Sequence, residues 1–141
     1  MRKRSGVTLA VIGCIVFFFC VEGWGADWKF IAKDVQGTVS EIDVTSITHH
    51  PNNIVRVWVK RTYSQMTINQ MVNDLGTKYT TLSYSIVLHE VHCTQNKFRI
   101  LTTRNYSSVI GLIDTETSSF TEWDFITPDS MGEALLKEVC K

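Results

Sequence analysis

Hydrophobic and polar residues alternate along most of the chain beyond residue 27, a pattern typical of half-buried β-strands. The clearest case is residues 53–63, where Val55, Val57 and Val59 share one face of the predicted strand. Ile54, Arg56, Trp58 and Lys60 share its other face. The predicted strands span residues 28–33, 38–44, 53–63, 79–93, 97–106, 108–116 and 120–126. Short turns separate them, including turn-forming residues at 49–53, so the pattern predicts an antiparallel meander.

Residues 64–78 break this alternation and predict a short amphipathic helix. Thr67 with Gln70 resembles a capping box at its start, and Gly76 is suited to its end. The Met66–Met71–Leu75 side of this helix is either a self-association face or the side that packs on the sheet edge. The apolar stripe consists of Ile68, Met71, Val72 and Leu75.

The end of the chain also predicts a helix. It follows Pro128, and Ser130 with Glu133 forms an S-x-x-E capping box. A helix with such a stripe must bury it, and the sheet is the large apolar surface that the sequence offers. We therefore predict an α+β fold, with an antiparallel sheet of about six strands and a C-terminal helix packed on one face. The stripe consists of Met131, Leu135 and Val139, with Leu136 and Cys140 beside it.

Residues 1–25 have the features of a secretory signal peptide: a basic head, an apolar run and small residues before the cleavage position. The apolar run of about 15 residues is shorter than the roughly 20 that span a bilayer, although a membrane anchor is the alternative. Cleavage after Gly25 would leave residues 26–141 as one domain. The stretch "VIGC" ending at Cys14 is similar to a lipoprotein cleavage box, and lipidation there would anchor the protein in a membrane.

Export changes both the charge and the cysteine chemistry. Residues 1–25 hold three basic residues and one acidic residue, so their removal shifts the net charge from zero to −2. That balance argues against nucleic-acid binding. Two cysteines would remain, Cys93 and Cys140, and an exported chain with two cysteines is expected to pair them. This disulfide would tether the C-terminal helix to the sheet.

The stretch "LHEVHC" at residues 88–93 raises the question of a metal site. Its H-E-x-H spacing is one residue shorter than the zinc-peptidase signature, and on a strand His89 and His92 point to opposite faces. A metal ion would need His49 or His50 from the preceding turn and a carboxylate such as Glu90. Ordinary polar positions at a strand end are the simpler interpretation, so we predict no metal and no cofactor.

Cys93 with His89 on the same strand face is loosely similar to a Cys-His catalytic pair. Export favours oxidation of the thiol instead. The sequence has no Gly-rich phosphate loop and no G-x-S-x-G motif. We predict that the protein is not an enzyme.

Arg56, Trp58 and Lys60 form a row with an aromatic side chain between two cations. Such a row is suited to binding an anionic or carbohydrate-like partner surface. The alternative is that Trp58 packs under the aliphatic stems of its neighbours.

The order of these segments resembles that of the surface-adhesin protein E family of bacterial exported proteins, over about residues 28–141. The resemblance rests on "WKFI", "SEIDVTSI", "VRVWVKRTYS", "LHEVHC", "KFRIL", "NYSSVIGLI" and "EWDFITPDSMGEALLKEVCK", in that order. It implies a sheet whose C-terminal helix is tethered by a disulfide between Cys93 and Cys140. It also implies adhesion, because the protein that names the family binds host extracellular-matrix and serum proteins.

These observations predict an exported, non-enzymatic binding module of the cell envelope, located in the periplasm or on the outer cell surface. Its partners would be extracellular-matrix-like or envelope proteins. One alternative is an envelope structural or assembly factor that self-associates, for example as a homodimer. Another is a metal-binding or enzymatic protein that uses the histidines.

Overall fold

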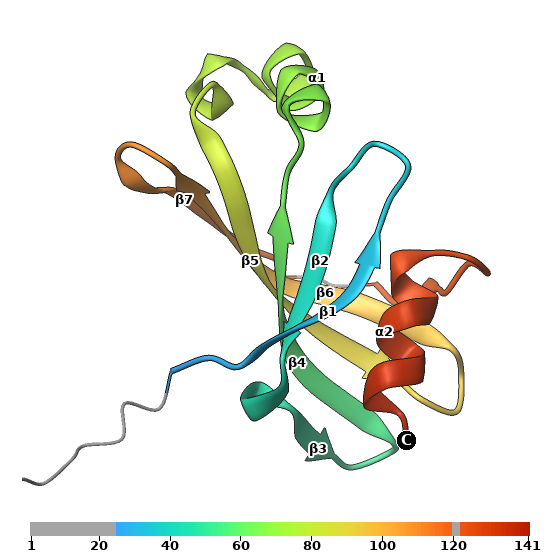
Figure 1. The fold of residues 1–141 in the computed structure, drawn as a ribbon. Helices are drawn as coiled ribbons and strands as arrows, with labels where there is room; N and C mark the ends of the chain where they lie inside the picture. The colour runs from blue at the N-terminus through green and yellow to red at the C-terminus, as the bar shows by residue number, and fades with distance from the viewer. Residues whose placement is uncertain (1–24, 120–121) are drawn as a thin grey trace, which may run out of the picture.

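The structure, a computed structural model, describes residues 25–119 and 122–141. The predicted signal peptide and Cys14 lie outside the described residues, apart from Gly25. In the described part of the chain, an eight-stranded antiparallel sheet is accompanied by two α-helices (Figure 1). The strands are β1 (Trp28–Lys33), β2 (Val39–Asp43), β3 (Thr48–His50), β4 (Ile54–Thr62), β5 (Leu82–His92), β6 (Lys97–Ser107), β7 (Gly111–Thr117) and β8 (Asp124–Phe125). The helices are α1 (Gln65–Leu75) and α2 (Met131–Val139), with short 3-10 turns η1 (Val44–Ser46) and η2 (Thr77–Tyr79).

The main path of the sheet is β1-β2-β4-β5-β6-β7, which confirms the predicted meander. The two further strands are short: β3 pairs with β4, and β8 pairs with β6. The sequence predicts a turn at residues 49–53, but residues 49 and 50 belong to β3 and the turn follows at residues 51–53. Asn52 and Asn53 take the left-handed conformation there, with φ of 65° and 58°, as asparagine tolerates.

One face of the sheet forms the core. Val55, Val57 and Val59 on β4 are at most 3% exposed, which confirms the predicted alternation on that strand. Helix α2 packs its predicted stripe on the same face, where Leu135 and Val139 are buried against the valines. Each such side chain contributes about 1.5–3 kcal/mol of hydrophobic stabilisation, so this contact is a large share of the fold's stability.

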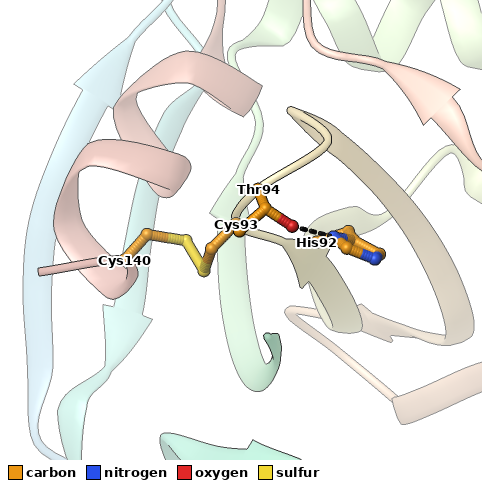
Figure 2. The surroundings of a disulfide bond; sticks show 4 residues. All are labelled: His92, Cys93, Thr94 and Cys140. Carbon is orange, nitrogen blue, oxygen red and sulfur yellow. Dashed lines mark hydrogen bonds between the residues drawn. A yellow bond between two sulfur atoms is a disulfide. The ribbon is translucent and has the colours of Figure 1, made fainter. Parts of the chain in front are cut away.

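A disulfide between Cys93 and Cys140 ties the end of α2 to the end of β5 (Figure 2). It joins residues 47 positions apart in the sequence. An ion pair between Lys29 and Glu138, at 2.5 Å, links α2 to β1 as well. The start of α2 is capped as predicted, because Ser130 Oγ accepts a hydrogen bond from the Glu133 amide.

Helix α1 is confirmed, but its predicted cap is wrong. Ser64 caps the helix, since its Oγ accepts a hydrogen bond from the Thr67 amide, so the true cap lies three residues before Thr67. Gly76 ends the helix at φ 108°, as predicted. Ile68 is the residue of α1 that is buried, whereas Met66 and Leu75 are 65% and 58% exposed. The expected packing of the Met66–Leu75 side on the sheet is therefore not observed.

Neither helix within residues 25–119 and 122–141 is long and apolar enough to cross a membrane.

Candidate partner-binding face

The face of the sheet opposite α2, here called the open face, carries the side chains that alternate with the core residues. On β4 these are Arg56, Trp58 and Lys60, each about half-buried. Strand register brings Glu90 of β5 opposite Arg56, and Arg99 of β6 opposite Glu90. The open face is therefore built from three neighbouring strands whose side chains meet across the ladder.

Glu90 lies at the centre of a charged cluster with two arginines. Arg56 donates hydrogen bonds from Nε and a terminal nitrogen to Glu90 Oε1, at 3.1 and 2.5 Å. Arg99 donates from Nε to Oε2 at 2.7 Å, and its terminal nitrogen lies 2.6 Å from the same oxygen. Glu90 itself is only 3% exposed, so each arginine is fixed in position by a desolvated carboxylate.

The pKa of Glu90 reflects two opposing effects. Burial alone would raise it, because the charged form loses water. The hydrogen bonds from Arg56 and Arg99 outweigh burial and lower the pKa below its ordinary value. Glu90 is thus a structural anion, and the cluster carries a net charge of about +1 at neutral pH.

Cations and aromatic rings alternate across the rest of the open face. Lys60 Nζ lies 5.8 Å from the Trp28 ring centre and 5.3 Å from that of Tyr84. The guanidinium carbon of Arg104 lies 5.7 Å from the ring of Trp58. Each of these distances is within the range of an attractive cation–π contact.

The pattern continues toward the edge of the sheet. The guanidinium carbon of Arg99 lies 4.4 Å from the Trp123 ring, and the same ring meets His92 edge-on at 5.7 Å. The rings of Tyr84 and Tyr106 stack at 5.0 Å between centres. Together these contacts hold flat aromatic surfaces and fixed cations at the surface of the protein.

The structure places Arg56, Trp58 and Lys60 on one face, as predicted, but each has its contacts on another strand. Trp58 carries Arg104 over its ring, whereas the prediction weighed packing only under its neighbours on the same strand. The sequence analysis did not find the other members of the open face. Strict alternation over residues 97–106 would put Arg99 and Arg104 on opposite faces, and only the observed strand register brings both onto the open face. The members it did not find are Trp28, Tyr84, Arg99, Arg104, Tyr106 and Trp123.

The two histidines of "LHEVHC" lie on opposite faces, as predicted. His89 is fully buried on the core side, 6.1 Å from the ring of Phe98. Burial lowers its pKa from 6.5 to about 4, so the imidazole is neutral. His92 lies on the open face, where its Nδ1 is 3.3 Å from the Thr94 hydroxyl (Figure 2).

His49 and His50 do not join them. They line a separate hollow of about 290 Å³ beside the disulfide, together with Cys93 and Cys140. Of the residues that the structure describes, no three or more His, Cys, Asp or Glu side chains are grouped to hold a metal ion. Cys93 is in the disulfide, so no free thiol lies beside His89.

Comparison with known proteins decides the family. The family model described as surface-adhesin protein E matches residues 28–141. The chain belongs to the surface-adhesin protein E family. This confirms the resemblance, and it implies an exported or cell-surface protein with an adhesive role.

One solved structure shares the fold. A crystal structure of Haemophilus influenzae protein E aligns with a TM-score of 0.53 and 15% identity, covering 80% of this chain and 86% of that chain. A second structure, of protein E from non-typeable Haemophilus influenzae, aligns at 0.49 and 15% identity over 80% of this chain and 74% of that one. At this identity the likeness shows the fold alone. No curated protein sequence matches the chain.

Proposed function

We propose that this protein is an exported, non-enzymatic adhesion module that binds extracellular proteins through the open face of its sheet. The observation that carries the proposal is the alternation of fixed cations with aromatic rings on a face that α2 leaves uncovered. Aromatic and arginine side chains are the residue types that dominate binding energy at protein interfaces. The side chains that we assign to binding are Arg56, Trp58, Lys60, Tyr84, Arg99 and Arg104.

The charge of the open face specifies the kind of partner. Five cations lie on it, whereas Glu90 is enclosed by two of them and Glu41 lies 4.0 Å from Lys60. The face thus presents positive charge although the mature chain is slightly acidic. Its partner should present carboxylates or other anionic groups, and binding should weaken as salt screens them. The five cations are Arg56, Lys60, Lys97, Arg99 and Arg104.

The disulfide supports this role. Adhesion requires a rigid surface outside the cell, and the bond between Cys93 and Cys140 fixes α2 against the opposite face of the same strands. Preorganised side chains lose less conformational entropy on binding.

The test is a binding assay of the purified exported protein against immobilised extracellular-matrix and serum proteins. Any partner found should bind Trp58→Ala and Arg104→Gln at least about tenfold more weakly, as expected for interface anchors. Lys137→Gln is the matched control, since Lys137 is an exposed cation on α2. Equal loss of binding in the control, or unchanged binding in both open-face variants, would contradict the proposal.

Self-association is a second candidate function, and a separate surface favours it. Met66 and Leu75 on α1 and Val109 and Ile110 in the β6–β7 turn are all more than half exposed. Both elements lie at the end of the sheet far from the disulfide (Figure 1). Sedimentation analysis separates the two proposals: a ligand-independent dimer lost in Leu75→Lys would favour assembly, whereas a monomer that still binds matrix proteins would favour adhesion.

A further inference from the structure

A second cavity lies on the α2 side of the sheet, where α2 begins. It has a volume of about 330 Å³ and lies between the β1–β2 hairpin and the start of the helix. Small-molecule sites in proteins begin at about this size. We name it the hairpin cavity. Its lining includes Lys33, Asp34, Ser40, Arg61, Asp129 and Met131.

Arg61 is the unusual residue of the hairpin cavity. Strand register places it on the core side of β4, between Ser40 and Ser85, which are both buried and small. Its Nε is buried without a hydrogen-bond partner, and its guanidinium forms no ion pair with any residue that the structure describes. Its aromatic contact is the Tyr63 ring, 6.0 Å away. Burying a cationic donor without an acceptor costs free energy. We therefore expect an anionic group to accept a hydrogen bond from Arg61.

Asp129 faces the same cavity with the opposite charge. Its side chain has no hydrogen bond or ion pair within the described residues, and its backbone takes the left-handed conformation at φ 57°. Asp34 also lines the cavity, but its carboxylate is already hydrogen-bonded, because its Oδ1 accepts hydrogen bonds from the backbone amides of Gln36 and Thr38. The cavity therefore holds a buried donor without an acceptor, on Arg61, and an unpaired carboxylate, on Asp129, that do not reach each other; Lys33, which also lines the cavity, is exposed.

We propose that the hairpin cavity binds a small zwitterion, such as a free amino acid. The ligand's carboxylate pairs with the Arg61 guanidinium, and its ammonium pairs with the Asp129 carboxylate. Ala32, Val35 and Met131 supply an apolar lining for an aliphatic side chain. This inference does not depend on the adhesive function of the open face.

The probe is L-leucine, added to the isotope-labelled exported protein with its disulfide intact and followed by amide NMR. Leucine should cause saturable shifts at residues 32–35 and 130–131. Two analogues each keep one of the two charged groups of leucine: 4-methylpentanoate lacks the ammonium, and isoamylamine lacks the carboxylate. Each should bind at least about tenfold more weakly than leucine, since each loses one charge-assisted contact. Absence of shifts with leucine at millimolar concentration, or equal binding of 4-methylpentanoate, would overturn the proposal.

Two variants test the residues. Arg61→Gln should weaken leucine binding at least about tenfold. Asp129→Asn should do the same while keeping a side chain that tolerates the left-handed conformation, so it remains informative if Arg61→Gln does not fold. Arg104→Gln on the open face is the control and should leave leucine binding unchanged. Unchanged leucine affinity in Asp129→Asn would contradict the assignment.

Discussion

Arg56 donates two hydrogen bonds to one carboxylate oxygen of Glu90, across the β4–β5 pair and on the face that α2 leaves open. The other oxygen of Glu90 is held by Arg99 from β6. One nearly buried carboxylate on β5 thus positions two cations, one on each of the neighbouring strands β4 and β6. The open face is rigid because its charges are tied to the sheet beneath them.

Replacement of Glu90 tests this cluster. Glu90→Gln keeps the shape of the side chain but removes the charge that two arginines share. We expect the free energy of unfolding to fall by about 1.5–3 kcal/mol, the range for hydrogen bonds to charged groups. Urea denaturation measures it, with the exposed Glu122→Gln as a control that should change stability by less than about 0.5 kcal/mol. Equal stability of Glu90→Gln and the control would show that the cluster contributes nothing.

Acid should destabilise the protein through His89. Folded His89 stays neutral above pH about 4, whereas the unfolded residue takes up a proton below its ordinary pKa of 6.5. The unfolded state therefore binds more protons between these values, and stability is lost as the pH falls through that window. The full loss is about 3 kcal/mol.

The matched variants for this prediction are His89→Leu and His49→Gln. His89→Leu should flatten the dependence of unfolding free energy on pH between 6.5 and about 4. His49→Gln, at an exposed position, should keep the wild-type profile. A wild-type slope in His89→Leu would assign the acid sensitivity to other groups.

Loss of the disulfide should weaken the attachment of α2. Cys140→Ser removes a cross-link between residues 47 positions apart, which the chain-entropy relation values at about 4 kcal/mol. Thermal unfolding should show a Tm lower by roughly 15 °C, while far-UV circular dichroism of the sheet is retained. The double variant Cys93→Ser/Cys140→Ser should match the single variant. An unchanged Tm would mean that packing alone holds α2.

A buried polar network offers an independent test at the other end of the sheet. Asp114 accepts hydrogen bonds from the buried Asn105 amide and from the hydroxyl of Tyr79, at 2.7 and 2.9 Å. Asp114→Ala leaves Asn105 without an acceptor and should lower the unfolding free energy by about 1–3 kcal/mol. Chemical denaturation measures this against the exposed Asp74→Ala. A loss no larger than that of Asp74→Ala would show that water replaces the carboxylate at no cost.

Local patterns in the sequence were enough to predict the elements of this fold. Alternation identified the buried valines of β4, and Ser130 with Gly76 marked one helix start and one helix end. The cap of α1 was missed because Ser64 and Thr67 both fit a cap, and only the observed hydrogen bond from the Thr67 amide distinguishes them. β3 was missed because three residues are too few to show a period of two.

The open face was predicted only in part because it depends on register between distant strands. A register shift between Leu88 and His89, where β5 pairs with β6, brings Arg104 opposite Ile86 and so onto the open face. Such a bulge leaves no mark in a single sequence. The contact of Lys60 with Trp28 likewise depends on how β1, β2 and β4 pair, and not on spacing along the chain.

Side-chain footprinting of the protein bound to an extracellular partner tests the central claim most directly. Oxidative labelling reports on tryptophan, tyrosine and methionine side chains individually. We predict that Trp58, Tyr84 and Tyr106 are protected in the complex, whereas the exposed Met66 on α1 is labelled as in the free protein. Protection of Met66 with unchanged labelling of Trp58 and the two tyrosines would place the partner on α1 and contradict binding through the open face.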